Sequence, residues 1–525
     1  MPPVPAGPDL HDSALRALIA GRLLEADAMI ADMLRRNEGD ARAWSLKARL
    51  AAERGDFTAE MHDALKTVNL APGNGAYLAQ LGKCHARRND MAAALACADA
   101  AEALPELDDV TLDAIASIHT RLARHARAAD ILTRAAAGSR NAAVHFNLGA
   151  SRKFCGDFDG ARDAFEAAIA LAPDYHKAHA ALTSLGGITA DRHHLDRLLP
   201  LIARTPDATQ RIHLSHAAAK EFEALGRHDD AFAALRDGKA ALRQRLDYRF
   251  ADDQALFDSL HAAFDTPRDV TGFTDAAPVF VVGMPRSGTT VLDRIVSNHP
   301  DIASIGETQQ FPNLLKQSVH STSRHVLDGP AVAALTQAGG LTGIGRAYCQ
   351  NGEAMSRGRR FLDKFHLNVL AAGFIAQALP KAQILCMVRD PLDTIVSNYR
   401  QLFEFSSPTY RYHLDLAATA RFYVAFRRLV ELWAARFPRQ FHVVGYEDLV
   451  RAHEPEVRRI LDLCGLSWEE RCLRIEDNDA PVATASAVQV RQPINACSIG
   501  NWRRYEAHLD EVKQILSAAG LYSAV

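Results

Sequence analysis

Residues 278–290 read PVFVVGMPRSGTT and decide the fold of the second half of the chain. The first five residues are apolar and rich in valine, which is typical of a buried strand in a parallel sheet. Gly283 begins a glycine-bearing loop, and the VLDRIVSNH that follows has the apolar spacing of a helix. A strand, a loop and a helix in this order aim backbone N–H groups and a helix N-terminus at an anion. We therefore expect a phosphate-binding loop, to which Arg286 adds a cation.

The loop has the length of the Walker A motif, G-x-x-x-x-G-K-[ST], but Thr289 stands at the lysine position. That lysine neutralises the terminal phosphates of a nucleoside triphosphate, so its absence argues against an ATPase or a kinase. Ser287, Thr289 and Thr290 supply hydroxyl donors instead, and Arg286 supplies the charge. A tight glycine–proline turn without a ligand is the alternative, which the whole string after a strand disfavours.

A second anion site is predicted further along the chain. Residues 382–388 (AQILCMV) indicate another buried strand, which ends in Arg389-Asp390-Pro391 before the helical LDTIVSNYRQLF. Pro391 suits the first turn of a helix, and Arg389 and Ser397 can approach one phosphate from opposite sides. By itself an Arg-Asp-Pro strand end is often only a capped turn. Together the two motifs predict a nucleotide that carries phosphates at two separate points.

This combination resembles the sulfotransferases that use 3′-phosphoadenosine 5′-phosphosulfate (PAPS), and above all the tyrosylprotein sulfotransferases and their bacterial tetratricopeptide relatives. The matching stretches are PRSGTT (residues 285–290), Arg389 with Ser397, and the run through HPD (residues 299–301) to Glu307. The resemblance implies an α/β P-loop-like domain over residues 278–525, with a central parallel sheet flanked by helices. It also implies PAPS as donor substrate and 3′,5′-ADP (PAP) as product, with no metal.

The resemblance assigns roles to single residues as well. Glu307 corresponds to the catalytic base, and Arg286 and Lys364 are candidates for stabilising the leaving group, while His366 is a rival base. The residues implied to bind the nucleotide are Arg286, Ser287, Gly288, Thr289, Thr290, Arg389, Ser397, Tyr446 and Ser486.

The chain departs from the tyrosylprotein enzymes at three positions. Gln401 stands where that family has a further arginine of the 3′-phosphate site, although Arg400 is adjacent. Gln309 and Asn313 replace arginines that grip an acidic peptide in the family. The expected acceptor is a hydroxyl, in the first place a tyrosine of a protein or peptide, and its identity stays open.

The first half of the chain shows an internal repeat of about 34 residues. In residues 148–173, LGASRKFCGDFDGARDAFEAAIALAP, small residues recur where two helices must touch, Gly156-Asp157 makes a turn and Pro173 ends the second helix. The pattern resembles a tetratricopeptide array, an all-α superhelix, over residues 1–264. Its groove is expected to bind the protein or peptide acceptor. A scaffold or dimerisation surface, and thus a homo-oligomer, is the open alternative.

The composition of the chain gives further expectations about its domain boundary, its partners and its cellular compartment. Residues 265–277 (DTPRDVTGFTDAA) break the helical pattern and predict a linker. The 60 basic and 63 acidic residues leave a net charge of −3, which gives no support for nucleic-acid or membrane binding. The eight cysteines show no C-x-x-C pair, which is typical of a reducing compartment. The first residues lack the features of a signal peptide, so a cytoplasmic protein is expected.

Two other classes of function remain at this point. One is a P-loop kinase or nucleotidase that uses ATP. The other is a non-catalytic tetratricopeptide scaffold with a vestigial nucleotide site, which the presence of Arg286, Glu307 and Lys364 disfavours.

Overall fold

The computed structural model describes residues 9–88, 90–122, 124–267, 270–405, 408–478 and 492–523. Contacts between residues divide the chain into two compact units. Unit 1 ends at Leu185, and unit 2 begins at Gly186 and contains the rest of the described chain.

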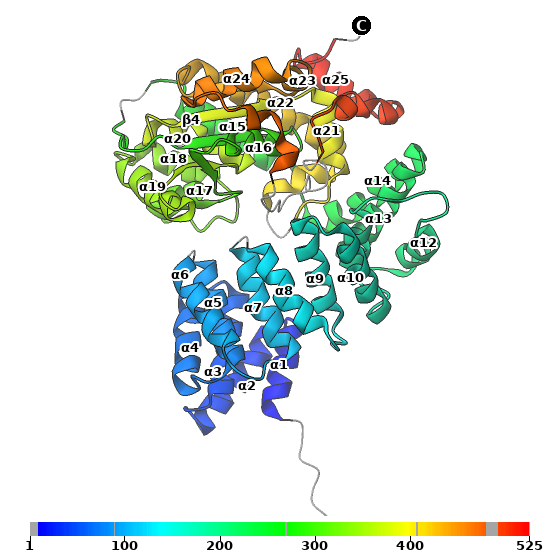
Figure 1. Ribbon diagram of the computed structural model, residues 1–525, viewed down its shortest axis with the longest axis vertical. Helices are drawn as coiled ribbons and strands as arrows, with labels where there is room; N and C mark the ends of the chain where they lie inside the picture. Colours follow the sequence, from blue (N-terminus) through cyan, green and yellow to red (C-terminus); the bar gives the residue numbers. More distant parts are fainter. Residues whose placement is uncertain are drawn as a thin grey trace, which may run out of the picture. The chain divides into compact units, whose positions relative to one another are not determined.

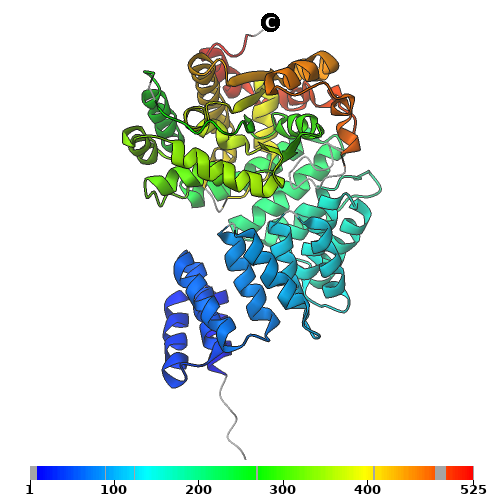
Figure 2. The same ribbon diagram turned by 60° about the vertical axis from the view of Figure 1, so that its left-hand side comes forward.

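Unit 1 consists of helices that pack against their neighbours in sequence, drawn from blue to teal in Figures 1 and 2. The helices are α1 Leu10–Ile19, α2 Leu23–Arg36, α3 Ala41–Arg54, α4 Phe57–Leu70, α5 Gly75–Arg87, α6 Met91–Glu102, α7 Asp109–Arg121, α8 His125–Ala136, α9 Ala142–Cys155, α10 Phe158–Leu171 and α11 His176–Thr183.

The α9–α10 pair shows how the repeat makes its turns. Gly156 ends α9 in the left-handed region with φ of 88°, and the Asp157 side chain then accepts the Gly160 N–H at the start of α10. Glycine is favoured after the end of a helix because it adopts a positive φ without strain. Aspartate is favoured just before a helix because its carboxylate accepts an N–H of the first turn. A Cβ on Gly149 would lie 2.6 Å from the Phe165 ring, so the two helices approach closely only because Gly149 has no side chain. The predicted helical pairs are confirmed.

Unit 2 starts with four further helices and continues into a sheet with its own helices. The first four are α12 Leu195–Arg204, α13 Ala208–Ala224, α14 His228–Leu246 and α15 Phe250–Ala263. The strands are β1 Val279–Gly283, β2 Ile302–Ser304, β3 Arg360–Asp363, β4 Gln383–Val388 and β5 Phe441–Gly445. The later helices are α16 Thr289–Ser297, α17 Gln310–Ser318, α18 Gly329–Gln337, α19 Thr342–Ser356, α20 Ala372–Ala378, α21 Pro391–Arg400, α22 Leu416–Arg436, α23 Tyr446–Arg451, α24 His453–Cys464 and α25 Asp510–Ala518. The 3₁₀ helices are η1 His366–Ala371, η2 Pro408–Leu414, η3 Glu470–Leu473, η4 Ile475–Asp477, η6 Ala496–Ser498 and η7 Asn501–His508.

The five strands form one parallel sheet in the order β2-β3-β1-β4-β5. Strands β1 and β4 are neighbours, and Gly283 at the end of β1 lies opposite Met387 near the end of β4. The two loops predicted to bind phosphate therefore leave the sheet side by side at its carboxyl edge. The predicted central parallel sheet flanked by helices is confirmed.

The sheet is buried on both faces, as expected for parallel strands. Along β1, Phe280 and Val282 pack into one hydrophobic cluster, which includes α22 and α15. Val279 and Val281 point to the opposite side, into a second cluster with α16 and α24. Figure 1 shows these helices around strand β4. Because successive strand residues point to opposite faces, the continuous apolar run PVFVV serves both clusters.

Helices α12–α15 belong to unit 2 and share a hydrophobic cluster with the sheet. Phe222 of α13 and Phe257 of α15 lie in the same cluster as Phe280 of β1 and Ile384 of β4. That the repeats extend to residue 264 and that residues 265–277 form a linker both stay predictions. In the structure, helices α12–α15 pack with the sheet. None of the helices in the described ranges combines the length and the apolar character needed to cross a bilayer.

One buried carboxyl in α15 makes the stability of unit 2 depend on pH. Burial raises the pKa of Asp253 to about 7, although the Tyr248 hydroxyl donates a hydrogen bond to it at 2.6 Å, which lowers it. A carboxyl that holds its proton more tightly in the folded state stabilises the fold fully below its ordinary pKa of 3.8, and this contribution is lost as the pH rises through about 7.

We therefore expect Asp253→Asn to flatten this dependence. Relative to the variant, the unchanged protein should lose about 1–3 kcal/mol of unfolding free energy between about pH 4 and about pH 8. Denaturant titrations of both proteins at several pH values measure the difference. Parallel curves would show that the Asp253 carboxyl does not titrate in this range.

Candidate functional site

Two residues of the loop between β1 and α16, Arg286 and Gly288, have a positive φ. Gly288 has a φ of 109°, and a Cβ there would lie 2.5 Å from Cδ2 of Tyr446. Arg286 has a φ of 66°, which is uncommon for a residue with a side chain and is found where a site holds its backbone in strain. The Ser287 hydroxyl turns inward and donates to the Met284 carbonyl at 2.8 Å. Ser287 therefore shapes the loop in this structure.

The second motif begins where β4 ends. The Asp390 side chain caps α21 by accepting the Asp393 N–H at 2.8 Å, and Pro391 occupies the first position of the helix, as predicted. This turn places Arg389 at the strand end, and Ser397 lies further along α21.

The two motifs contact each other directly. The Arg286 Nε lies 3.5 Å from the Ser397 Oγ, and an Arg389 amino group donates to the Arg286 carbonyl at 3.3 Å. The Asn398 amide donates to the Pro285 carbonyl at 2.7 Å. The phosphate loop and the start of α21 are thus held together by hydrogen bonds across the carboxyl edge of the sheet.

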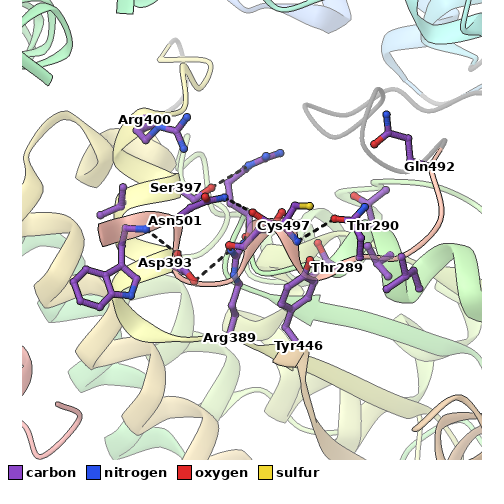
Figure 3. Close-up of a pocket in the computed structure, with 18 of the residues that line it drawn as sticks. Thr289, Thr290, Arg389, Asp393, Ser397, Arg400, Tyr446, Gln492, Cys497 and Asn501 are labelled. Carbon is purple, nitrogen blue, oxygen red and sulfur yellow. Dashed lines mark hydrogen bonds and ion pairs between the residues drawn. The ribbon is translucent and has the colours of Figure 1, made fainter. Parts of the chain in front are cut away.

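One cavity of about 400 Å³ lies between these motifs. Figure 3 shows Ser397 and Arg400 on one side of it, Thr289 and Thr290 on the other, and Arg389 and Tyr446 below. The predicted nucleotide-binding residues that line the cavity are Arg286, Gly288, Thr289, Thr290, Arg389, Ser397 and Tyr446. The predicted residue Ser486 lies outside the described residues.

Four arginines make the cavity suitable for an anion. Arg286, Arg389, Arg400 and Arg504 all line it. Desolvation, followed by the charges of Arg400 and Arg389, lowers the pKa of Arg286 to about 10. Clustered like charges destabilise one another, and a bound phosphate or sulfate relieves that repulsion. The Arg389 guanidinium also lies 4.8 Å from the centre of the Tyr446 ring, so the ring restricts where this cation can move.

Glu307 and Lys364 form an ion pair beside the sheet. Glu307 follows β2 and Lys364 follows β3, and these neighbouring strands are tied by the Lys364 N–H, which donates to the Gly306 carbonyl at 3.0 Å. The Lys364 Nζ donates to Glu307 Oε1 at 2.5 Å. The structure therefore brings these two predicted catalytic residues together, although neither is among the described residues that line the 400 Å³ cavity.

The charges around Glu307 set its protonation. Desolvation by itself would raise the pKa of Glu307, but the Lys364 ammonium and then His366 hold it below its ordinary value of 4.5. Desolvation lowers the pKa of His366 to about 4, against the pull of Glu307. The His366 Nδ1 lies 4.0 Å from Glu307 Oε1, and its Nε2 lies 3.0 Å from the Tyr410 hydroxyl. At neutral pH both side chains are therefore unprotonated and chemically able to accept a proton.

Several residues of the site were not among those expected from the sequence, and two of them, Asp393 and Glu223, hold other parts of the site in place. The buried Asp393 carboxylate accepts the backbone N–H groups of Gly500 and Trp502 at 2.6 and 3.1 Å, which holds the backbone beside Asn501 and Trp502, two residues that line the cavity. An aspartate in the first turn of a helix is favoured by the helix dipole alone, so its sequence position carries no sign of this contact. The second is Glu223, which binds Arg400.

The sulfotransferase family model matches residues 278–470, which include the phosphate loop, Glu307, Lys364 and the Arg389 motif. This segment of unit 2 is therefore similar to the sulfotransferase family, and the helical pairs of unit 1 lie outside the matched residues.

Relatives of known sequence or structure match parts of the chain. An "Uncharacterized protein" of Aquifex aeolicus (strain VF5) is 30% identical over 298 residues, which cover 55% of this chain and 39% of that protein. Protein-tyrosine sulfotransferase A of Caenorhabditis elegans is 24% identical over 250 residues, 45% of this chain and 63% of that enzyme. The chain thus spans less than two thirds of either relative. The sulfotransferase domain of the Synechococcus PCC 7002 olefin synthase is 19% identical with a TM-score of 0.35, and the match covers 49% of this chain and 98% of that domain.

Proposed function

We propose that the protein is a PAPS-dependent sulfotransferase that moves the sulfuryl group to a hydroxyl, in the first place to a tyrosine of a protein or peptide. The observation that carries the proposal is the single cavity lined by both anion motifs, with Arg286 from one and Arg389 from the other. PAPS carries a 3′-phosphate and a 5′-phosphosulfate, so it needs anion sites at two separate points. Arginines suit both groups because their planar guanidinium binds oxyanions through two parallel N–H bonds.

The reaction needs a base, a positioned donor and cations at the leaving group. The acceptor hydroxyl oxygen forms a bond to sulfur, and the bond from sulfur to the bridging oxygen of the 5′-phosphate breaks. The electron pair of that bond stays on the oxygen of 3′,5′-ADP, where Arg286 and Lys364 stabilise the charge. The hydroxyl proton passes to the Glu307 carboxylate and from there to solvent. A pKa of Glu307 below its ordinary value keeps this carboxylate ready to accept the proton at neutral pH.

The tyrosine acceptor and the role of the repeats are the finer parts of the proposal. The curated relatives include proteins named protein-tyrosine sulfotransferases, and this supports a phenolic hydroxyl as acceptor. Tetratricopeptide arrays offer a concave surface that suits an extended peptide, and we assign binding of the acceptor protein to unit 1. The cytoplasmic location stays a prediction from the sequence.

A competition between donors tests the proposal against an ATP-using enzyme. We expect 3′,5′-ADP to raise the melting temperature of the full-length protein, because a ligand that binds only the folded state stabilises it. ATP with Mg²⁺ should have no such effect, because Thr289 replaces the phosphate-binding lysine. Protection by ATP with Mg²⁺ and none by 3′,5′-ADP would overturn the PAPS assignment in favour of a kinase or nucleotidase.

A further inference from the structure

The inference concerns Arg400, the last residue of α21, which lines the cavity close to Ser397. The neighbouring Gln401 does not take up this position, because its side-chain amide donates to the Leu402 carbonyl at 3.1 Å. Arg400 is therefore one of the four arginines that line the cavity, with Arg286, Arg389 and Arg504.

Arg400 is held by a carboxylate from the helical part of unit 2. The Arg400 Nε donates to Glu223 Oε1 at 2.5 Å, and its Nη2 donates to Glu223 Oε2. The Tyr505 hydroxyl donates to the same Oε1 at 2.6 Å. Glu223 lies at the end of α13, 177 residues before Arg400 in the chain. A carboxylate that binds two guanidinium nitrogens in parallel fixes both the position and the plane of the guanidinium.

This geometry leaves Arg400 able to bind a second anion. A guanidinium has five N–H donors, and the two contacts with Glu223 use the Nε edge of the group. The opposite edge of the guanidinium carries further N–H donors, and because Arg400 lines the cavity they can donate to a ligand there, at an orientation set by Glu223. Without that anchor an arginine at a helix end would have to give up side-chain entropy on binding a phosphate. Glu223 therefore orders the cation before the ligand arrives.

A second anchor holds the backbone just after Arg400. Lys239 of α14 is fully enclosed, and its ammonium donates to the carbonyls of Gln401 and His413 at 3.3 and 3.0 Å. The ammonium also lies 5.1 Å from the centre of the Tyr399 ring. The α13–α14 hairpin thus fixes both the side chain of Arg400 and the chain that follows it.

We propose that Glu223 is a positioning residue of the donor site, which orients Arg400 toward the 3′-phosphate of the nucleotide. The inference rests on the proposed function for the identity of the ligand. The helical hairpin α13–α14 then contributes to nucleotide binding, although its sequence pattern predicts one more helical pair of the repeat.

The test compares two nucleotides that differ only in the 3′-phosphate. Calorimetric titration measures the affinity of 3′,5′-ADP and of 5′-AMP for the full-length protein and for Glu223→Gln. The glutamine keeps the size of the side chain but accepts only one of the two guanidinium bonds. We expect the affinity for 3′,5′-ADP to fall about tenfold and the affinity for 5′-AMP to change by less than about twofold.

A double-variant comparison separates positioning from a general loss of structure. Arg400→Ala should weaken 3′,5′-ADP as well, and adding Glu223→Gln to it should cause no further loss, because Glu223 acts only through Arg400. Asp229→Asn is the matched control: Asp229 lies on α14 and contacts His508 at 2.9 Å, so it joins the same hairpin to the same C-terminal segment without touching Arg400. This control should leave both affinities unchanged.

The outcomes separate this inference from the proposed function. Equal weakening of both nucleotides by Glu223→Gln, an additive loss in the double variant, or an unchanged or higher affinity for 3′,5′-ADP would each overturn the positioning role. If the unchanged protein binds ATP with Mg²⁺ and not 3′,5′-ADP, the donor assignment fails. The affinities of ATP for the unchanged protein, for Glu223→Gln, for Arg400→Ala and for the double variant then decide whether Glu223 positions Arg400. A protein that binds none of the three nucleotides overturns both.

Discussion

Replacing Glu307 with glutamine is expected to leave the affinity for 3′,5′-ADP unchanged and to lower the rate of sulfuryl transfer by about 10²–10⁴-fold. The affinity should survive because Glu307 is not among the described residues that line the cavity. The rate should fall because an amide cannot accept the hydroxyl proton. Glutamine still offers an oxygen to the Lys364 ammonium, which otherwise would lose its 2.5 Å partner. Labelled PAPS with a tyrosine-containing protein acceptor provides the rate, and nucleotide titration provides the affinity.

The control for Glu307 is an exposed glutamate within residues 278–470, the segment that the family model matches. Glu353 lies on α19, and Glu353→Gln should leave transfer unchanged. A Glu307→Gln variant with full activity would move the role of base to another residue, and His366 is the nearest candidate. The acid side of a pH profile does not distinguish the two, because the pKa of Glu307 lies below 4.5 and that of His366 at about 4. The comparison of Glu307→Gln with His366→Asn does.

Replacing Arg286 with alanine is expected to weaken 3′,5′-ADP binding by about 1.5–3 kcal/mol, or about 10–150-fold, the usual loss for a charge-assisted hydrogen bond. Alanine is again a residue with a Cβ at a φ of 66°, so the strain of the loop backbone is kept and the guanidinium alone is removed. Arg286→Ala also removes the repulsion between Arg286 and the guanidinium groups of Arg389 and Arg400, which works toward a smaller effect.

A matched arginine outside the cavity controls for the loss of net charge. Arg451 ends α23 in the same family segment and is exposed, so Arg451→Ala should leave nucleotide affinity unchanged. An Arg286→Ala variant with unchanged affinity would contradict the assignment of the loop to the donor. Arg286→Lys keeps the charge but loses the planar fork, and an intermediate affinity is expected for it.

Much of the site was predictable because its parts are local. Runs of a few residues predict strands β1 and β4, the loop at Gly288 and the helix start at Pro391, because the backbone conformation there depends on those residues themselves. Strand β2 was missed because its three residues, Ile302–Ser304, are too few for a pattern. The separate catalytic roles of Glu307 and Lys364 came from the resemblance, and their ion pair, seen only in the structure, depends on β2 and β3 being neighbours.

The sequence by itself determined the elements that short segments encode: helix pairs with Gly-Asp turns, apolar strands, and two anion motifs at strand ends. Only the tertiary structure decided which distant residues meet, such as Glu223 with Arg400 and Asp393 with the backbone of Gly500. The physical reason is that periodicity and turn chemistry act over neighbouring residues, whereas a contact across 177 residues depends on how two hydrophobic faces pack. For the same reason, the helices before residue 264 were expected to belong with the repeats alone, while Phe222 and Phe257 join the core of the sheet.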